Sequence, residues 1–364
     1  MDNKRLLSLD AFRGLTIALM IIVNSPGNYT AYSLFQHSAW NGCTLADIVF
    51  PFFLFMVGVS IPFSLRYSRE MNQEREITYR IVRRSFILFA IGVFLNAFPH
   101  NFDLGSIRIM GILQRIAICY LVAALLFLKT TIKTQAISLV LILIGYGLLL
   151  TLPFNSTNHF SPENNLAIYI DHLFFSSAHL YHQSFEPEGL LSTLPAIATT
   201  LLGNLTGQLL CSKAAPKQKL LYICLAGIVT TILGWLLGLI LPINKGMWTS
   251  SYVLWTGGLA LLMLSLLYWI IEIKKLQRWT LPLRIFSLNA IAAYILHIFF
   301  LKVQGMVNVT QSDGSIVSLR LYITDYLFSW ANPNNASLFY AIYYMLFWLL
   351  ILSLLYRQKI IIKV

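Results

Sequence analysis

Long apolar runs separated by short polar segments dominate this chain. The runs lack the polar stripe of an amphipathic helix, and a helix that is apolar on all sides lies in a large core or in lipid. Many runs approach 20 residues, the length that crosses a bilayer. The pattern therefore predicts an all-α, polytopic transmembrane helix bundle of about ten helices. The predicted spans are Ala11 to about Asn24, Leu45–Leu65, Ser85–Phe98, Ile112–Leu128, Ala136–Leu152, Leu190–Leu210, Leu220–Leu241, Tyr252–Ile271, Leu283–Leu301 and Ala336–Tyr356.

Composition strengthens this interpretation. Of the 364 residues, 57% are hydrophobic and only 11% are charged, whereas a soluble domain usually has about 25% charged residues. We predict a single transmembrane domain over residues 1–364, in contact with the lipid bilayer. The net charge of +12 comes without a basic groove that is interleaved with aromatic residues, so nucleic acid is not a predicted partner.

The basic residues are distributed unevenly between the predicted loops. One side of the bundle has 21 of the 26 Lys and Arg residues, in the N-terminus, 66–84, 129–133, 213–219, 274–284 and 357–363. The positive-inside rule places this side in the cytoplasm, and ten spans then place both termini there. The remaining five basic residues are Arg108, Arg115, Lys245, Lys302 and Arg320.

Two predicted outer loops are long, roughly 153–189 and 302–335, and loops of that length are often functional. The first is rich in histidine and aromatic residues. His179 and His182 have a spacing compatible with metal binding, but the sequence places no third strong ligand beside them. No metal site is predicted.

The first span contains an informative polar residue. Leu15–Val23 is nine residues, about 13 Å of helix, and Asn24-Ser25-Pro26-Gly27-Asn28 follows it. Either the helix continues with polar groups facing inward, or it breaks at membrane depth, which is tolerated only where the backbone lines a cavity or is buried in protein. Both options place Asn24 near a polar cavity; the simpler alternative is an asparagine that joins two helices by a hydrogen bond.

The turn after the first span contains His37, and Asp47 begins the next apolar helix ten residues later. A carboxylate can orient an imidazole and stabilise its cationic form. Alternatively, His37 is an ordinary loop histidine and Asp47 only interacts favourably with the helix dipole.

Two further pairs of polar residues lie at the ends of spans or within them. Arg108 and Arg115 flank the start of the fourth span, where they bind an anion such as phosphate or extend to the interface as long cationic side chains do. Asn289 and His297 are eight residues apart, so one helical face can have both; the alternative is hydrogen bonding between helices. These patterns fit an enzyme and a sugar transporter equally well, and a non-catalytic scaffold less well.

Specific motifs favour an enzyme. The segment SLDAFRGLTIALMIIVN, followed by QHSAWNGCTLADIVFPFFLFMVGVSI, resembles the heparan-α-glucosaminide N-acetyltransferase family of transmembrane acyltransferases. Supporting stretches, in the same order, are RIMGILQRIAICYLV, PEGLLSTLPAIATTLLG, WTSSYVLWTGG and SLNAIAAYILH.

The resemblance implies an acyltransferase that uses cytosolic acetyl-CoA. It implies that His37 is catalytic and that Asn24 and Asp47 belong to the same site. It extends, with weaker motifs, to Arg108, Arg115, Asn289 and His297, which we assign to donor binding. Arg13 is a further candidate for the phosphates of the donor, because it lies on the basic side.

The family's animal members acetylate the terminal glucosamine of heparan sulfate in the lysosome, whereas this chain starts at the shared block, as bacterial members do. We therefore expect a bacterial inner (cytoplasmic) membrane and an amino sugar or envelope glycan as acceptor. His37 would act as the general base, or as a nucleophile that carries the acyl group. A homo-oligomer is compatible with this architecture and is not defined by the sequence.

Overall fold

The computed structural model describes residues 6–362 except 71–73, 100–101, 104, 153–158, 164, 182–184 and 312–313, and only the backbone of 67–70. His182 therefore lies outside the described residues. The described part contains thirteen α-helices and a single short hairpin. This confirms the predicted all-α fold. The chain divides into two compact units. A single domain over 1–364 stays a prediction.

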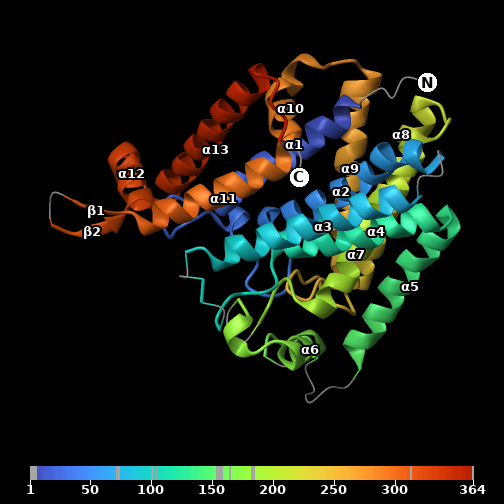
Figure 1. The fold of residues 1–364 in the computed structure, drawn as a ribbon, viewed down its shortest axis with the longest axis horizontal. Coiled ribbons are helices and arrows are strands. Elements are labelled where there is room, and N and C mark those ends of the chain that lie inside the picture. The colour runs from blue at the N-terminus through green and yellow to red at the C-terminus, as the bar shows by residue number, and fades with distance from the viewer. Residues whose placement is uncertain are drawn as a thin grey trace. The chain divides into compact units, whose positions relative to one another are not determined.

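The first unit comprises residues up to His37, Thr44–Phe50 and Leu267 onward. Its helices are α1 (Leu7–Asn24), α10 (Leu281–Leu288), α11 (Ala290–Met306), α12 (Leu319–Phe328) and α13 (Pro333–Arg357), with the hairpin β1 (Asn308–Thr310) and β2 (Ile316–Ser318). Helix α1 packs on α10, α11 and α13. In Figure 1 the hairpin and α12 lie together at one end of α11.

The second unit comprises Ser38–Cys43 and Pro51–Leu266. Its helices are most of α2 (Leu45–Glu70), then α3 (Glu74–Ala97), α4 (Ile112–Lys129), α5 (Ile132–Thr151), α6 (Leu166–Phe174), α7 (Leu190–Cys211), α8 (Pro216–Leu237) and most of α9 (Ser250–Tyr268). Helix α7 packs on α4, α5, α6 and α8, and α3 packs along α4.

The predicted spans fall on helices, but the ninth is broken at Asn289, and the third lies in α3, which is not among the described helices that are long and apolar enough to cross a membrane. Among the described residues, eight helices are long and apolar enough to cross a membrane, and a ninth span is the pair α10–α11, which bends by 70°. Helix α3 begins eleven residues before the predicted Ser85, because hydropathy does not detect its charged first half. The chain is thus an integral membrane protein with a polytopic helix bundle.

The long outer loops are more ordered than the sequence predicts. Helix α6 lies within 153–189, and α12 and the hairpin lie within 302–335. Helices of nine and ten residues are too short to cross a bilayer, so a search for membrane spans does not detect them.

Two glycines allow α2 and α7 to approach closely in the second unit. A Cβ atom on Gly58 would lie 2.0 Å from the Thr200 carbonyl oxygen, and one on Gly203 would lie 2.0 Å from the Phe55 carbonyl oxygen. Small residues at such contacts let helix backbones meet in membrane proteins.

We expect Gly203→Ala to destabilise the protein by about 1–3 kcal/mol, because the added methyl group forces the backbones apart. Thermal unfolding in detergent measures this effect. The matched control is Gly145→Ala in α5, where a Cβ would meet nothing within 4 Å. Equal melting temperatures for the two variants would contradict the close contact.

Candidate functional site

A direct contact between His37 and Asp47 is the centre of the candidate site in the first unit. His37 follows a short 3-10 turn, Ser33–Phe35, and Asp47 lies in the first turn of α2. Nδ1 of His37 lies 2.7 Å from Oδ1 of Asp47. The Asp47 side chain is fully buried, whereas 52% of the His37 side chain is exposed. The predicted pair is therefore in contact, with a half-exposed imidazole on a buried carboxylate.

The start of α2 fixes the orientation of the Asp47 carboxylate. Its Oδ2 accepts a hydrogen bond from the Thr44 amide at 3.1 Å, and the Thr44 hydroxyl lies 3.1 Å from the same oxygen. Because an ionised carboxylate only accepts hydrogen bonds, the His37 hydrogen sits on Nδ1. Nε2 then keeps a lone pair that can take a proton or attack a carbonyl.

Helix α1 ends at Asn24 after 18 residues and is long and apolar enough to cross a membrane, so the predicted break at membrane depth stays a prediction. Asn24 is partly buried, and its side chain makes no hydrogen bond to any described residue. The chain beyond α1 contacts α13: the Gly27 amide donates to Ser337 Oγ at 3.0 Å, and Asn28 donates to the Pro333 carbonyl oxygen at 3.0 Å. The segment after α1 is thus held in place by α13.

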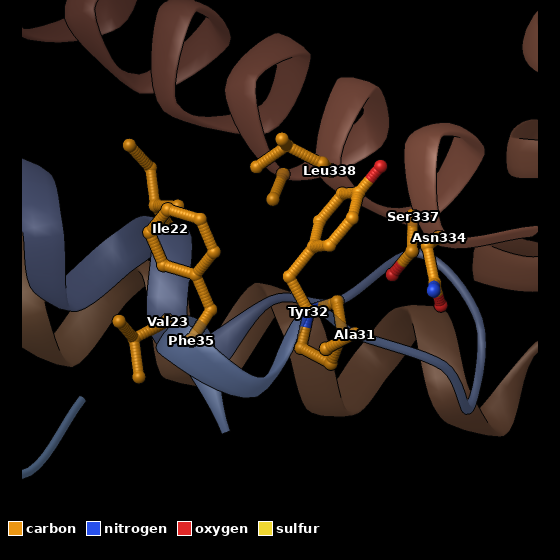
Figure 2. Close-up of a pocket in the computed structure, with 10 residues that line it drawn as sticks. Ile22, Val23, Ala31, Tyr32, Phe35, Asn334, Ser337 and Leu338 are labelled. Atoms are coloured by element: carbon orange, nitrogen blue, oxygen red, sulfur yellow. The ribbon is translucent and has the colours of Figure 1, made fainter. Parts of the chain in front are cut away.

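A mainly apolar pocket of the first unit lies beside this segment. Figure 2 shows Tyr32 and Phe35 at the pocket between the end of α1 and the start of α13. It is lined by Ile22, Val23, Pro26, Ala31, Tyr32, Phe35, Asn334, Ser337, Leu338 and Ala341. The segment between Asn24 and His37 therefore forms one wall of a space that suits a small apolar group.

The other predicted residues of the first unit have these contacts. Arg13 lies 3.9 Å from Asp10 and is partly exposed. Asn289 sits at the break between α10 and α11 and bonds the backbone of Ile360 and Ile362, at 3.2 and 2.8 Å. Asn289 is the N-cap of α11, and its carbonyl oxygen accepts a 2.7 Å hydrogen bond from the Ala293 amide in the first turn. The roles of these residues in donor binding stay predictions.

His297 is completely buried in α11. Its Nδ1 lies 3.0 Å from the Ala293 carbonyl oxygen, and its Nε2 has no hydrogen-bond partner among the described residues. This leaves one buried acceptor of the first unit for a ligand donor or a water molecule.

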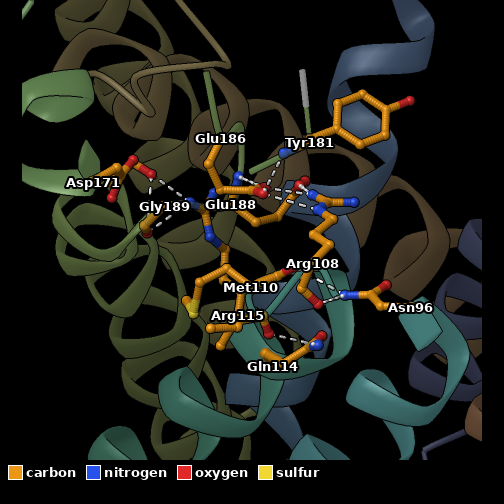
Figure 3. Close-up of polar contacts among 12 residues, drawn as sticks. Asn96, Arg108, Met110, Gln114, Arg115, Asp171, Tyr181, Glu186, Glu188 and Gly189 are labelled. Atoms are coloured by element: carbon orange, nitrogen blue, oxygen red, sulfur yellow. Dashed lines mark hydrogen bonds and ion pairs between the residues drawn. The ribbon is translucent and has the colours of Figure 1, made fainter. Parts of the chain in front are cut away.

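Arg108 and Arg115 are brought together in the second unit with two acids that the sequence reading did not single out. Arg108 Nε donates to Glu186 at 2.9 Å, and its Nη2 bonds both Glu186 and Glu188, the latter at 2.5 Å. Arg115 Nη2 bonds Ser192 and the Gly189 carbonyl oxygen. Figure 3 shows these side chains pointing toward one another. The predicted role of both arginines in donor binding stays a prediction.

Electrostatics favour the ionised forms of Glu188 and Arg108 in this cluster. Burial opposes the charged form of Glu188, but Arg108, Arg115 and Lys245 outweigh it and hold the pKa of Glu188 below its usual range. Burial likewise opposes the charge on Arg108, and its two glutamate partners more than compensate, so the pKa of Arg108 rises.

Asp171 in α6 borders the same cluster and behaves differently. Burial raises its pKa to about 7 and Glu186 adds to the rise, although the Leu190 amide donates a 2.8 Å hydrogen bond to its carboxylate. The pKa of this carboxyl group is higher in the folded state than its unfolded value of 3.8, so its contribution to stability is fully present at a pH below 3.8. The stabilisation is lost as the pH rises through about 7.

We therefore expect Asp171→Asn to flatten the dependence of thermal stability on pH between pH 5 and 8, because the amide keeps the acceptor oxygen but does not titrate. Unfolding temperatures across this range measure the effect, with Glu163→Gln at an exposed acid of the same unit as control. A parent-like pH profile in Asp171→Asn would show that Asp171 is not the titrating group.

Comparison with known proteins adds the family to this geometry. Residues 5–240 match the family model described as heparan-alpha-glucosaminide N-acetyltransferase, catalytic. The chain belongs to this family. The matched part contains Asn24, His37, Asp47, Arg108 and Arg115, and it ends before Asn289.

Two curated relatives support the membership in this acyltransferase family. The human heparan-alpha-glucosaminide N-acetyltransferase is 29% identical over an alignment of 425 residues, which covers 99% of this chain and 60% of that protein. The mouse protein of the same name is 31% identical over 353 residues, covering 80% of this chain and 53% of that protein. The chain thus spans little more than half the length of these relatives.

Proposed function

We propose that this protein transfers an acetyl group from cytoplasmic acetyl-CoA to the amine of an amino sugar or envelope glycan on the outer side of the membrane. One observation carries the proposal: the buried Asp47 carboxylate orients the exposed His37 imidazole at 2.7 Å, within the segment that matches an N-acetyltransferase family. A carboxylate-oriented imidazole is a standard arrangement for moving a proton in acyl transfer.

In the proposed direct reaction, Nε2 of His37 takes a proton from the acceptor amine. The nitrogen attacks the thioester carbonyl, the new C–N bond forms, the C–S bond breaks, and the coenzyme A thiolate leaves and takes up a proton. Asn24 would donate a hydrogen bond to the carbonyl oxygen as negative charge develops there. Its amide is available for this role, because it has no hydrogen-bond partner among the described residues.

A covalent route is the alternative chemistry at the same site. Nε2 of His37 would attack the thioester itself, and the acetyl-imidazole would then pass its acetyl group to the amine. We favour direct transfer, because the predicted break at the end of α1 can let both substrates meet at one depth. Trapping of an acetylated enzyme with donor alone would instead support the covalent route.

Sidedness follows from charge. Because most of the basic residues lie on one side, we propose that this side and both termini face the cytoplasm, in a bacterial inner membrane. The polyanionic donor would then approach from the basic face. Arg13, Asn289 and His297 are the proposed donor contacts in the first unit.

Release of free thiol from acetyl-CoA by the purified protein tests the function. We expect release that depends on glucosamine, with N-acetylglucosamine identified by mass spectrometry. N-acetylglucosamine as the acceptor is the matched control, because its nitrogen is already acylated. Thiol release with both sugars would indicate transfer to oxygen. A lack of thiol release with every amino sugar tested would contradict the proposal.

A further inference from the structure

In the second unit, Glu188 differs from its neighbour Glu186 in how its carboxylate is used. Glu186 accepts both bonds from Arg108 and further bonds from the amides of Tyr181 and Glu188, each at 3.1 Å. Glu188 accepts only the 2.5 Å bond from Arg108 through Oε2. Among the described residues Oε1 of Glu188 has no donor, and 9% of this side chain is exposed. One ionised oxygen therefore remains for a ligand.

Arg115 supplies the complementary donors. Its side chain is completely buried, yet Nε and Nη1 have no hydrogen-bond partner among the described residues. Figure 3 shows the side chain pointing to the segment of Glu186, Glu188 and Gly189, and its guanidinium stacks on the Trp248 ring at 4.9 Å. Buried polar groups are nearly always paired, so these two donors indicate a binding site for a ligand with hydrogen-bond acceptors.

An aromatic ring completes the arrangement. The Tyr181 ring lies 4.5 Å from the Arg108 guanidinium, and 54% of this residue is exposed. Figure 3 shows its hydroxyl pointing away from the charged groups. An exposed ring beside convergent polar groups is a usual composition for a small-molecule site.

We propose that Glu188, Arg115, Arg108 and Tyr181 form the recognition site for the amino sugar: Glu188 accepts from its ammonium group and Arg115 donates to a neighbouring hydroxyl. We call these four residues the outer cluster. The inference rests on the proposed function, since it names residues that hold the acceptor.

The pattern of donors and acceptors selects the chemistry of the ligand. The outer cluster keeps Arg108 occupied by Glu186 and Glu188. What it offers is one ionised acceptor beside two donors, which complements an amine next to a hydroxyl. A phosphate would meet the carboxylate of Glu188, and a neutral sugar would leave Oε1 of Glu188 without a cationic donor.

Binding of glucosamine to the purified protein, without any donor, tests this inference by isothermal titration calorimetry. We expect Glu188→Gln to raise the Kd for glucosamine about tenfold or more, because a charge-assisted hydrogen bond is lost, with the Kd for acetyl-CoA unchanged. Glu163→Gln, at an exposed acid of the outer loop, should bind glucosamine as the parent does. Glucose should bind more weakly than glucosamine to the parent, and this preference should disappear in Glu188→Gln.

Two outcomes would overturn the inference: parent-like glucosamine binding in Glu188→Gln, or loss of acetyl-CoA binding instead, which would make the outer cluster a donor site. If Glu188→Gln does not fold, Tyr181→Ala should weaken glucosamine binding while Tyr181→Phe retains it, and equal binding by both would count against the site. Because binding is measured without acetyl-CoA, the two proposals can fail separately. If the parent binds glucosamine through Glu188 but transfers no acetyl group, the proposed acyl transfer is refuted and this inference stands. If the parent and Glu188→Gln transfer acetyl groups at equal rates, this inference is refuted and acyl transfer stands.

Discussion

His37→Ala is expected to lower glucosamine-dependent release of coenzyme A by about 10²–10⁴-fold, the usual contribution of a positioned general base. The residue is half-exposed and its imidazole is oriented through Nδ1 by Asp47, so alanine removes the proton acceptor with little loss of buried contact. Initial rates with saturating acetyl-CoA, beside thermal unfolding of the same sample, measure this effect.

The control is His172→Ala, at an exposed histidine of α6 in the second unit. It should retain the parent rate. Parent-like turnover by a folded His37→Ala protein would remove His37 from the chemistry under both routes, direct and covalent.

Asp47→Asn is expected to lower the turnover number by about 10³–10⁴-fold, because an amide can donate to Nδ1 and so favour the wrong imidazole tautomer. The amide oxygen can still accept from Thr44, which should preserve the start of α2. The KM for acetyl-CoA should change little, since Asp47 acts through His37.

Thr44→Val is the matched comparison for Asp47→Asn. It removes a hydroxyl 3.1 Å from Oδ2 of Asp47 and leaves the carboxylate with its 2.7 Å contact to His37, so we expect a loss of less than about tenfold. Equal losses in the two variants would show that the local turn, and not the carboxylate, limits the reaction.

Patterns that are local in sequence predicted much of this structure. Most apolar runs became single helices, because burial in lipid leaves a backbone few other ways to satisfy its hydrogen bonds. The His37–Asp47 contact was also foreseeable, since only ten residues and one turn separate the pair. The helix break at Asn289 was not, because its side chain bonds a backbone more than 70 residues away.

The glutamates of the second unit show the limit of local reasoning. Glu186 and Glu188 lie 78 and 80 positions from Arg108, so only tertiary packing brings them together. The segment EPEGLLSTLP contained the signal: two acids flank a proline just before an apolar helix, where carboxylates are costly unless they are paired.

The most direct test of transmembrane acyl transfer uses proteoliposomes with glucosamine sealed inside and acetyl-CoA added only outside. We predict that N-acetylglucosamine accumulates in the lumen with the parent protein and not with His37→Ala, as measured by mass spectrometry of washed vesicles. Product formed only when both substrates share one compartment would contradict transfer across the bilayer. Escape of unmodified glucosamine, without consumption of acetyl-CoA, would instead identify a transporter.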